Sequence, residues 1–173
     1  MLYYLEWVFW LYVMTLKIYE CSEIELAEML EKTRWAKNFS WEQICQISSQ
    51  MTACTADRGD VIFSEGATDN TMGIVVQGKL DIVKDDIENN PKVIASLFPP
   101  QSFGEMSLID GEPRSAGVVA KSDVLLLFLT KEKIQELADT RPSLAFKLLW
   151  MVTKMLSQRL RKTSGSLVEY LDE

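Results

Sequence analysis

The sequence predicts an α+β, mainly β fold: an antiparallel jelly-roll β-barrel flanked by N-terminal and C-terminal helices. In the middle of the chain, short apolar runs alternate with turn residues, a pattern typical of antiparallel sandwiches and jelly rolls. On both sides of this region, apolar residues recur at helical spacing behind Ser or Thr residues that can cap a helix. We therefore divide the chain into an apolar N-terminal helix (1–20), a helical lead-in (21–51), a β-barrel (52–130) and C-terminal helices (131–173).

Composition narrows the possible functions. The 173 residues suffice for one domain with a core plus appended helices. The net charge of −7 argues against nucleic-acid binding, which needs a basic face. The chain has no histidine, the commonest general base and metal ligand, so we expect no enzyme, no catalytic residue and no metal site. Cys21, Cys45 and Cys54 have no CxxC spacing and indicate reduced thiols in a cytoplasmic protein.

The segment Met1–Tyr19 is apolar nearly all round and is interrupted only by Glu6, Thr15 and Lys17. As a helix it would be about 28 Å long, close to the thickness of a bilayer core. Three interpretations compete: an anchor on the cytoplasmic face of the inner membrane, a helix that docks into a protein partner, and a helix that packs on its own domain. Glu6 counts against a membrane span, because a carboxylate in the bilayer costs a few kcal/mol.

Two capping boxes predict the helices of the lead-in. Ser22 with Glu25 begins a helix that is expected to run to about Lys37, and Ser40 with Gln43 begins a second one to about Met51. The four acids of the first helix are expected to form a solvated face. The predicted apolar positions are Ile24, Leu26, Ala27, Leu30 and Trp35 in the first helix, and Ile44 and Ile47 in the second.

From about Thr52 onward, short apolar runs that alternate with turn residues predict β-strands. Gly59, Gly66 and Gly78 stand in turns that need positive φ. The predicted strands are Val61–Phe63, Ile74–Val76, Leu80–Val83, Val93–Phe98, Val118–Ala120 and Val124–Leu129.

Two helices are expected after the strands. Thr130 can cap a short helix, Lys131–Asp139, and Pro142 fits the first turn of a longer one. Apolar residues at spacings of three and four predict that the longer helix contributes to the core and to an oligomer contact. These residues are Leu144, Leu148, Met151 and Met155, with an adjoining stripe of Leu149, Val152, Leu156 and Leu160. The cations from Lys154 to Lys162 are expected to form a solvated helix end.

The stretch Phe103–Ala116 carries the candidate site. Its Glu105 can accept hydrogen bonds from hydroxyl groups, and its Arg114 can grip a phosphate with two parallel hydrogen bonds. Residues 106–109 suffice for one helical turn, whose first N–H groups attract anions. These residues predict a pocket for a ligand that carries both a hydroxyl and an anion.

The order Phe-Gly-Glu, then Pro-Arg-Ser-Ala, resembles the phosphate-binding cassette of the cyclic nucleotide-binding domain family, and Arg58–Gly66 resembles its opening strands. The resemblance implies that Glu105 binds the ribose 2′-hydroxyl and Arg114 the cyclic phosphate. It covers roughly residues 38–170 and makes residues 52–130 the ligand-binding barrel. The chain departs from the family at Gly73, expected to leave a looser spot where an aromatic is common, and at Gly117. The expected ligand-binding residues are Gly104, Glu105, Met106, Arg114, Ser115 and Ala116.

The resemblance also implies a function. The chain is expected to be a non-enzymatic sensor of a cyclic purine nucleotide, cAMP rather than cGMP, because no Thr follows Arg114. Residues 131–173 resemble the hinge and dimer helices of bacterial regulators in this family, so the signal is expected to pass to a protein partner or a homo-oligomer. No other cofactor is expected. The alternative is a structural adaptor without a ligand, in which Glu105 and Arg114 pair with each other and Met1–Tyr19 docks into a membrane or protein assembly.

Overall fold

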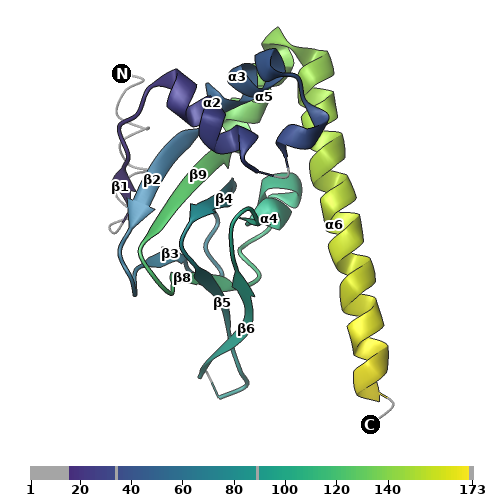
Figure 1. Cartoon of the computed structure of the whole chain (residues 1–173). Coiled ribbons are helices and arrows are strands. Elements are labelled where there is room, and N and C mark those ends of the chain that lie inside the picture. The colour runs from purple at the N-terminus through teal and green to yellow at the C-terminus, as the bar shows by residue number, and fades with distance from the viewer. Residues whose placement is uncertain (1–15, 34, 89, 172–173) are drawn as a thin grey trace.

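The computed structural model describes residues 16–33, 35–88 and 90–171. Two antiparallel sheets form its centre, with helices packed against one of them (Figure 1). This confirms the predicted α+β, mainly β fold. The strands are β1 (Lys17–Ile18), β2 (Thr52–Ala56), β3 (Val61–Phe63), β4 (Thr71–Gln77), β5 (Leu80–Asp85), β6 (Pro91–Leu97), β7 (Ser102–Phe103), β8 (Gly117–Ala120) and β9 (Val124–Thr130).

The five-stranded sheet has the order β1-β2-β9-β4-β7, and the four-stranded sheet has the order β3-β8-β5-β6. All six predicted strands form. The sequence reading missed β2, which is made of small and hydroxylated residues, and the short β7. The glycines at 59, 66 and 78 take the predicted positive φ.

Strand β9 shows how the core is built, because it is buried on both sides. Side chains alternate across a strand, so Leu126 and Phe128 face the core between the two sheets, while Leu127 and Leu129 belong to the core under the helices. The Phe128 ring packs near those of Phe63 and Phe103. The apolar residues of β9 therefore contribute to both cores, the one between the two sheets and the one between the five-stranded sheet and the helices.

The expected looser spot at Gly73 does not exist. A Cβ atom built on Gly73 would lie 2.3 Å from the ring of Phe103, so that ring already fills the space that a side chain would occupy. The prediction was wrong because the aromatic group comes from the neighbouring strand β7, which pairs with β4 at this residue.

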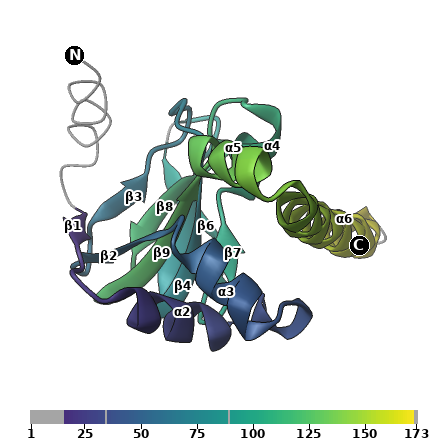
Figure 2. The same cartoon turned by 90° about the horizontal axis from the view of Figure 1, so that it is seen from above.

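The helical cover comprises α2 (Glu23–Glu31), a 3-10 turn (Ala36–Asn38), α3 (Trp41–Ser48), α5 (Lys131–Thr140) and α6 (Pro142–Leu171). Both predicted capping boxes are present. Figure 2 shows α6 almost end-on, to one side of the sheets. Among the described residues, no helix is long and apolar enough to cross a membrane.

Helix α2 ends earlier than predicted. The Thr33 hydroxyl donates to the Leu30 carbonyl at 2.6 Å and accepts from the Trp35 N–H at 3.2 Å. These side-chain hydrogen bonds replace the backbone hydrogen bonds that would continue the helix. The assignment of Ile24 to the apolar side of this helix was wrong, since Ile24 is 64% exposed. The buried arc is centred on Ala27 and Leu30, and Ile24 lies to the side of it.

The N-terminal segment was predicted as a helix to residue 20, and this is wrong for Lys17–Ile18, which form β1 and pair with β2. Lys17 also contacts Asp57 at 2.7 Å. The helix expected over residues 1–15 lies outside the described residues, so the three interpretations of this segment stay predictions. The three cysteines are free thiols, and burial raises the pKa of the Cys54 thiol to about 11, which keeps it protonated at neutral pH.

Candidate functional site

The candidate site is built around the short helix α4 (Glu105–Asp110), which begins directly after β7. Gly104 stands at the junction with φ of 76°. A Cβ atom at this position would lie 2.6 Å from Nη1 of Arg114, so only glycine allows the chain to turn this closely over the arginine. The sequence predicted this helical turn.

Arg114 is buried beneath the start of α4, and protein groups already satisfy most of its donors. Its Nε donates to Asp69 at 3.0 Å, and its Nη2 donates to the other oxygen of the same carboxylate. Nη1 donates to the Gly104 carbonyl at 2.9 Å and Nη2 to the Thr71 carbonyl at 2.5 Å. The guanidinium also lies 3.7 Å from the centre of the Phe63 ring. These contacts fix the position of the Arg114 guanidinium. The Asp69 carboxylate occupies its two parallel donors, Nε and Nη2.

Glu105 is only 2% exposed, and its cation comes from the far end of the chain. Arg159 of α6 donates from Nη1 to Oε1 of Glu105, and from Nη2 to the Ser102 carbonyl at 2.5 Å. The other oxygen, Oε2, is buried and has no hydrogen-bond partner. Glu105 and Arg114 each pair with another residue, so the pairing of these two with each other, which the adaptor alternative assumed, is wrong.

The remaining predicted residues surround these two. Met106 is 52% exposed, and the exposed Ser115 donates from its hydroxyl to the Met106 sulfur at 3.9 Å. Ala116, partly buried, follows Ser115 and leads into β8. The fold thus brings the six predicted residues to one end of α4, where their role in ligand binding stays a prediction.

The structure adds two residues that the sequence reading did not assign to the site. Asp69 lies in the loop before β4 and gave no local signal, because its partner Arg114 is 45 residues away. Arg159 was counted among the cations of a solvated helix end, which is wrong for this residue: its side chain is 42% exposed, but its guanidinium donates to Glu105 and to the Ser102 carbonyl. The error arises because α6 continues to Leu171, so Arg159 lies inside the helix and next to β7.

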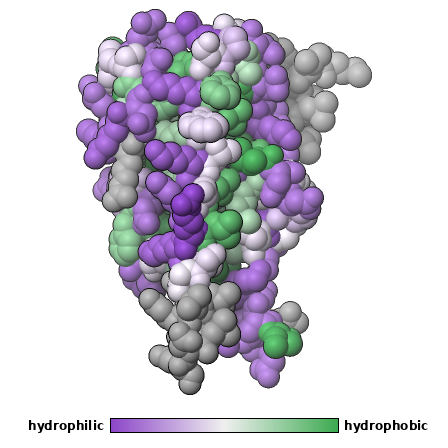
Figure 3. All heavy atoms as spheres, turned by 90° about the vertical axis from the view of Figure 1, so that its right-hand side faces the viewer, coloured by the Kyte–Doolittle hydropathy of each residue, from purple (hydrophilic) through white to green (hydrophobic). Residues whose placement is uncertain are grey.

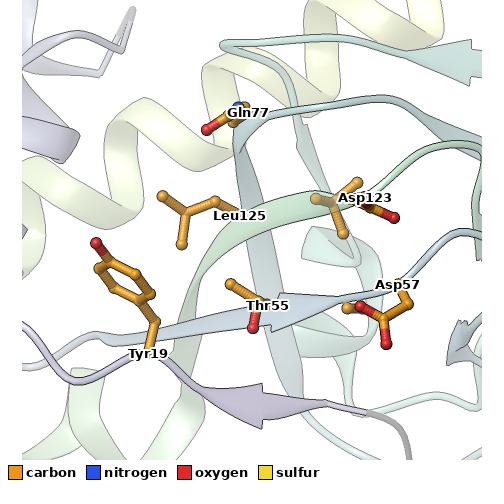
Figure 4. Close-up of a pocket in the computed structure, with 8 residues that line it drawn as sticks. Tyr19, Thr55, Asp57, Gln77, Asp123 and Leu125 are labelled. Carbon is orange, nitrogen blue, oxygen red and sulfur yellow. The ribbon is translucent and has the colours of Figure 1, made fainter.

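Two hollows elsewhere on the molecule do not involve the cassette. One, of about 330 Å³, lies between Tyr19, the ends of β2 and β4, and the start of β9 (Figure 4). The other lies along α6 between Trp150 and Arg161. Among the described residues, no group of three or more Cys, Asp or Glu side chains could hold a metal ion.

Comparison with known proteins identifies the family. Residues 54–141 match the family described as "Cyclic nucleotide-binding domain". The chain belongs to the cyclic nucleotide-binding domain family. The match runs from β2 to the end of α5 and so includes every predicted cassette residue.

Individual members of the family agree with this assignment. The crystal structure of a cyclic nucleotide-binding domain from Methylobacillus flagellatus KT is 26% identical, with a TM-score of 0.80 over 89% of this chain and 88% of that one. The cyclic AMP receptor protein of Thermus thermophilus is 33% identical over 105 residues, which make up 61% of this chain and 47% of that protein. A CRP-like cAMP-activated global transcriptional regulator of Mycobacterium tuberculosis is 23% identical over 74% of this chain and 55% of its own length. The chain thus spans about half the length of these curated relatives.

Proposed function

We propose that the chain is a non-enzymatic regulatory sensor that binds a 3′,5′-cyclic purine nucleotide, with cAMP favoured. The observation that carries this proposal is Oε2 of Glu105, a buried carboxylate oxygen without a partner at the start of α4. A buried acceptor left unpaired costs about 1–3 kcal/mol, which a ribose hydroxyl bound there would recover. Oε2 is shielded from solvent in this structure, so the side chains around it have to move before a hydroxyl can reach it. The names of the Thermus and Mycobacterium relatives, which specify cyclic AMP and cAMP, support the choice of ligand.

In this proposal the cyclic phosphate binds Arg114, as the family resemblance implies. The phosphate has to share the guanidinium with Asp69 or replace it, because Asp69 occupies two of the donors. Ligand binding then favours one position of α6 over another, since a ligand shifts an equilibrium only through differential contacts. The output passes through α6 to a protein partner or to a second copy of the chain.

The ligand-free adaptor is the second candidate, and a specific observation favours it. The two charged residues expected to bind the nucleotide already form ion pairs within the protein. Arg114 pairs with Asp69, and Glu105 pairs with Arg159. A binding pocket that has lost its ligand could keep such pairs as part of its structure, because buried charges need compensation.

Calorimetric titration distinguishes the two candidates. We expect the full chain to bind cAMP or cGMP with a dissociation constant of about 100 μM or tighter. Adenosine 5′-monophosphate, which lacks the phosphate ring, and cCMP, which carries a pyrimidine, serve as controls and should bind at least about tenfold more weakly. Absence of any heat with millimolar cAMP and cGMP would favour the adaptor.

A further inference from the structure

Lys84 is a charged residue on the face of β5 that packs in the core between the two sheets. Side chains alternate across a strand, so Lys84 lies on the same face as Leu80 and Ile82. Leu80 is buried in this core, and Ile82 packs against it. Lysine seldom stands on such a face unless it is paired, so the partners of Lys84 indicate what it does there.

Lys84 connects β5 to the cassette. Its Nζ donates to the Ser115 carbonyl at 2.6 Å and to Oε1 of Glu65 at 2.9 Å. Glu65 lies in the loop after β3, and the next residue, Gly66, donates its N–H to the Arg114 carbonyl at 2.8 Å. The Lys84 ammonium group is therefore in contact with the residue that directly follows Arg114.

A second lysine stands opposite Lys84 in the β5–β6 hairpin. The strand register pairs Lys84 with Lys92, and Lys92 contacts Asp86 at 3.0 Å. Like charges directly opposite each other destabilise a sheet, so these two ammonium groups favour anions beside them. Figure 1 shows the hairpin projecting below the sheets, and Figure 3 shows this lower end, viewed from the α6 side, as mainly hydrophilic.

The charged residues of the cassette are already neutralised. Arg114 is balanced by Asp69, which is the more exposed member of that pair. Glu105 is balanced by Arg159. These four side chains together carry no net charge, whereas a cyclic nucleotide brings one negative charge into the site. Another cation close to Arg114 would compensate that charge.

Lys84 can provide this cation because its present partner holds it weakly. The side chains of Lys84 and Glu65 are 49% and 34% exposed, so solvent screens their attraction. Arg114 itself is 2% exposed at its side chain, which makes its pair with an acid much harder to exchange. A phosphate can therefore replace Glu65 at the Lys84 ammonium group with little loss of stability.

We propose that Lys84 is a second cationic ligand of the cyclic phosphate, and that its ammonium group leaves Glu65 to donate to a phosphate oxygen when the nucleotide binds. This inference rests on the proposed function. It also assigns a role to Glu65, which competes with the nucleotide for Lys84. A purely structural role for the Lys84–Glu65 pair, as a link between β5 and the β3–β4 loop, predicts instead that loss of either residue weakens binding.

The test measures cAMP affinity by calorimetry in variants of the full chain. We expect Lys84→Met to weaken binding by about tenfold and Lys84→Arg, which keeps a cation, to stay within about threefold of the wild type. Glu65→Gln should strengthen binding by about threefold, because it frees Lys84 while its amide oxygen can still accept from the Asp85 N–H.

The exposed pair Lys133–Glu136 on α5 supplies the matched controls. Lys133→Met and Glu136→Gln make the same changes of charge away from the cassette, and both should leave the affinity within about twofold of the wild type. The inference is overturned, with the proposed function intact, if Lys84→Met binds cAMP as tightly as the wild type or if Lys84→Met and Glu65→Gln both weaken binding. If the wild type binds no cyclic nucleotide, the proposed function and this inference are both refuted.

Discussion

Replacing Arg114 with alanine is expected to weaken cyclic nucleotide binding by at least about a hundredfold. Alanine lacks the guanidinium whose two parallel N–H donors would bind the phosphate. Arg114 is buried, so water cannot take the place of its guanidinium. The same change leaves Asp69 and the carbonyls of Gly104 and Thr71 without their donor. The free energy of unfolding should therefore fall by about 3 kcal/mol, measured by urea denaturation.

Two further variants separate the loss of binding from the loss of stability. Arg58→Ala removes an exposed arginine from a loop of the same domain and should change neither property. Arg114→Lys keeps the charge but cannot form two parallel hydrogen bonds, so it should fold and bind with intermediate affinity. Unchanged affinity in a folded Arg114→Ala protein would refute the phosphate contact.

Replacing Asp69 with asparagine should have two opposite effects. Asp69 is the anion that now occupies the Arg114 fork, and its removal frees the charge of that arginine for a phosphate. We expect cAMP to bind about tenfold more tightly, measured by calorimetry. The free energy of unfolding should fall by about 2 kcal/mol, because a buried guanidinium loses its charged partner.

Asp85→Asn is the matched control, because Asp85 is an exposed acid on β5 and the substitution changes the net charge by the same amount. A general electrostatic attraction for the nucleotide would strengthen binding in both variants, whereas the proposed competition strengthens it only in Asp69→Asn. Weaker binding in Asp69→Asn would show that Asp69 orients Arg114 for the ligand instead of competing with it.

Local patterns predicted the elements of the fold well. Turn residues marked the ends of the strands, and the serine boxes marked the first residues of α2 and α3. These features depend on neighbours in the sequence, so a single chain displays them. The end of α2 was missed because the Thr33 hydroxyl competes with the helix backbone, and β1 was missed because pairing with β2 decides its conformation.

The sequence predicted the two charged residues of the candidate site but not their ion-pair partners. Glu105 and Arg114 stand in a short segment with a specific pattern, so both could be named from the sequence. Their partners Arg159 and Asp69 lie 54 and 45 residues away and are isolated charges in helix and loop segments. Only the three-dimensional arrangement shows that both anchors are paired.

A crystal structure of the chain in complex with cAMP would show whether the nucleotide binds between Glu105 and Arg114. We expect a ribose hydroxyl within about 3 Å of Oε2 of Glu105. We also expect the cyclic phosphate on Arg114. A nucleotide bound away from α4, or one bound at α4 without touching either side chain, would refute the proposed function.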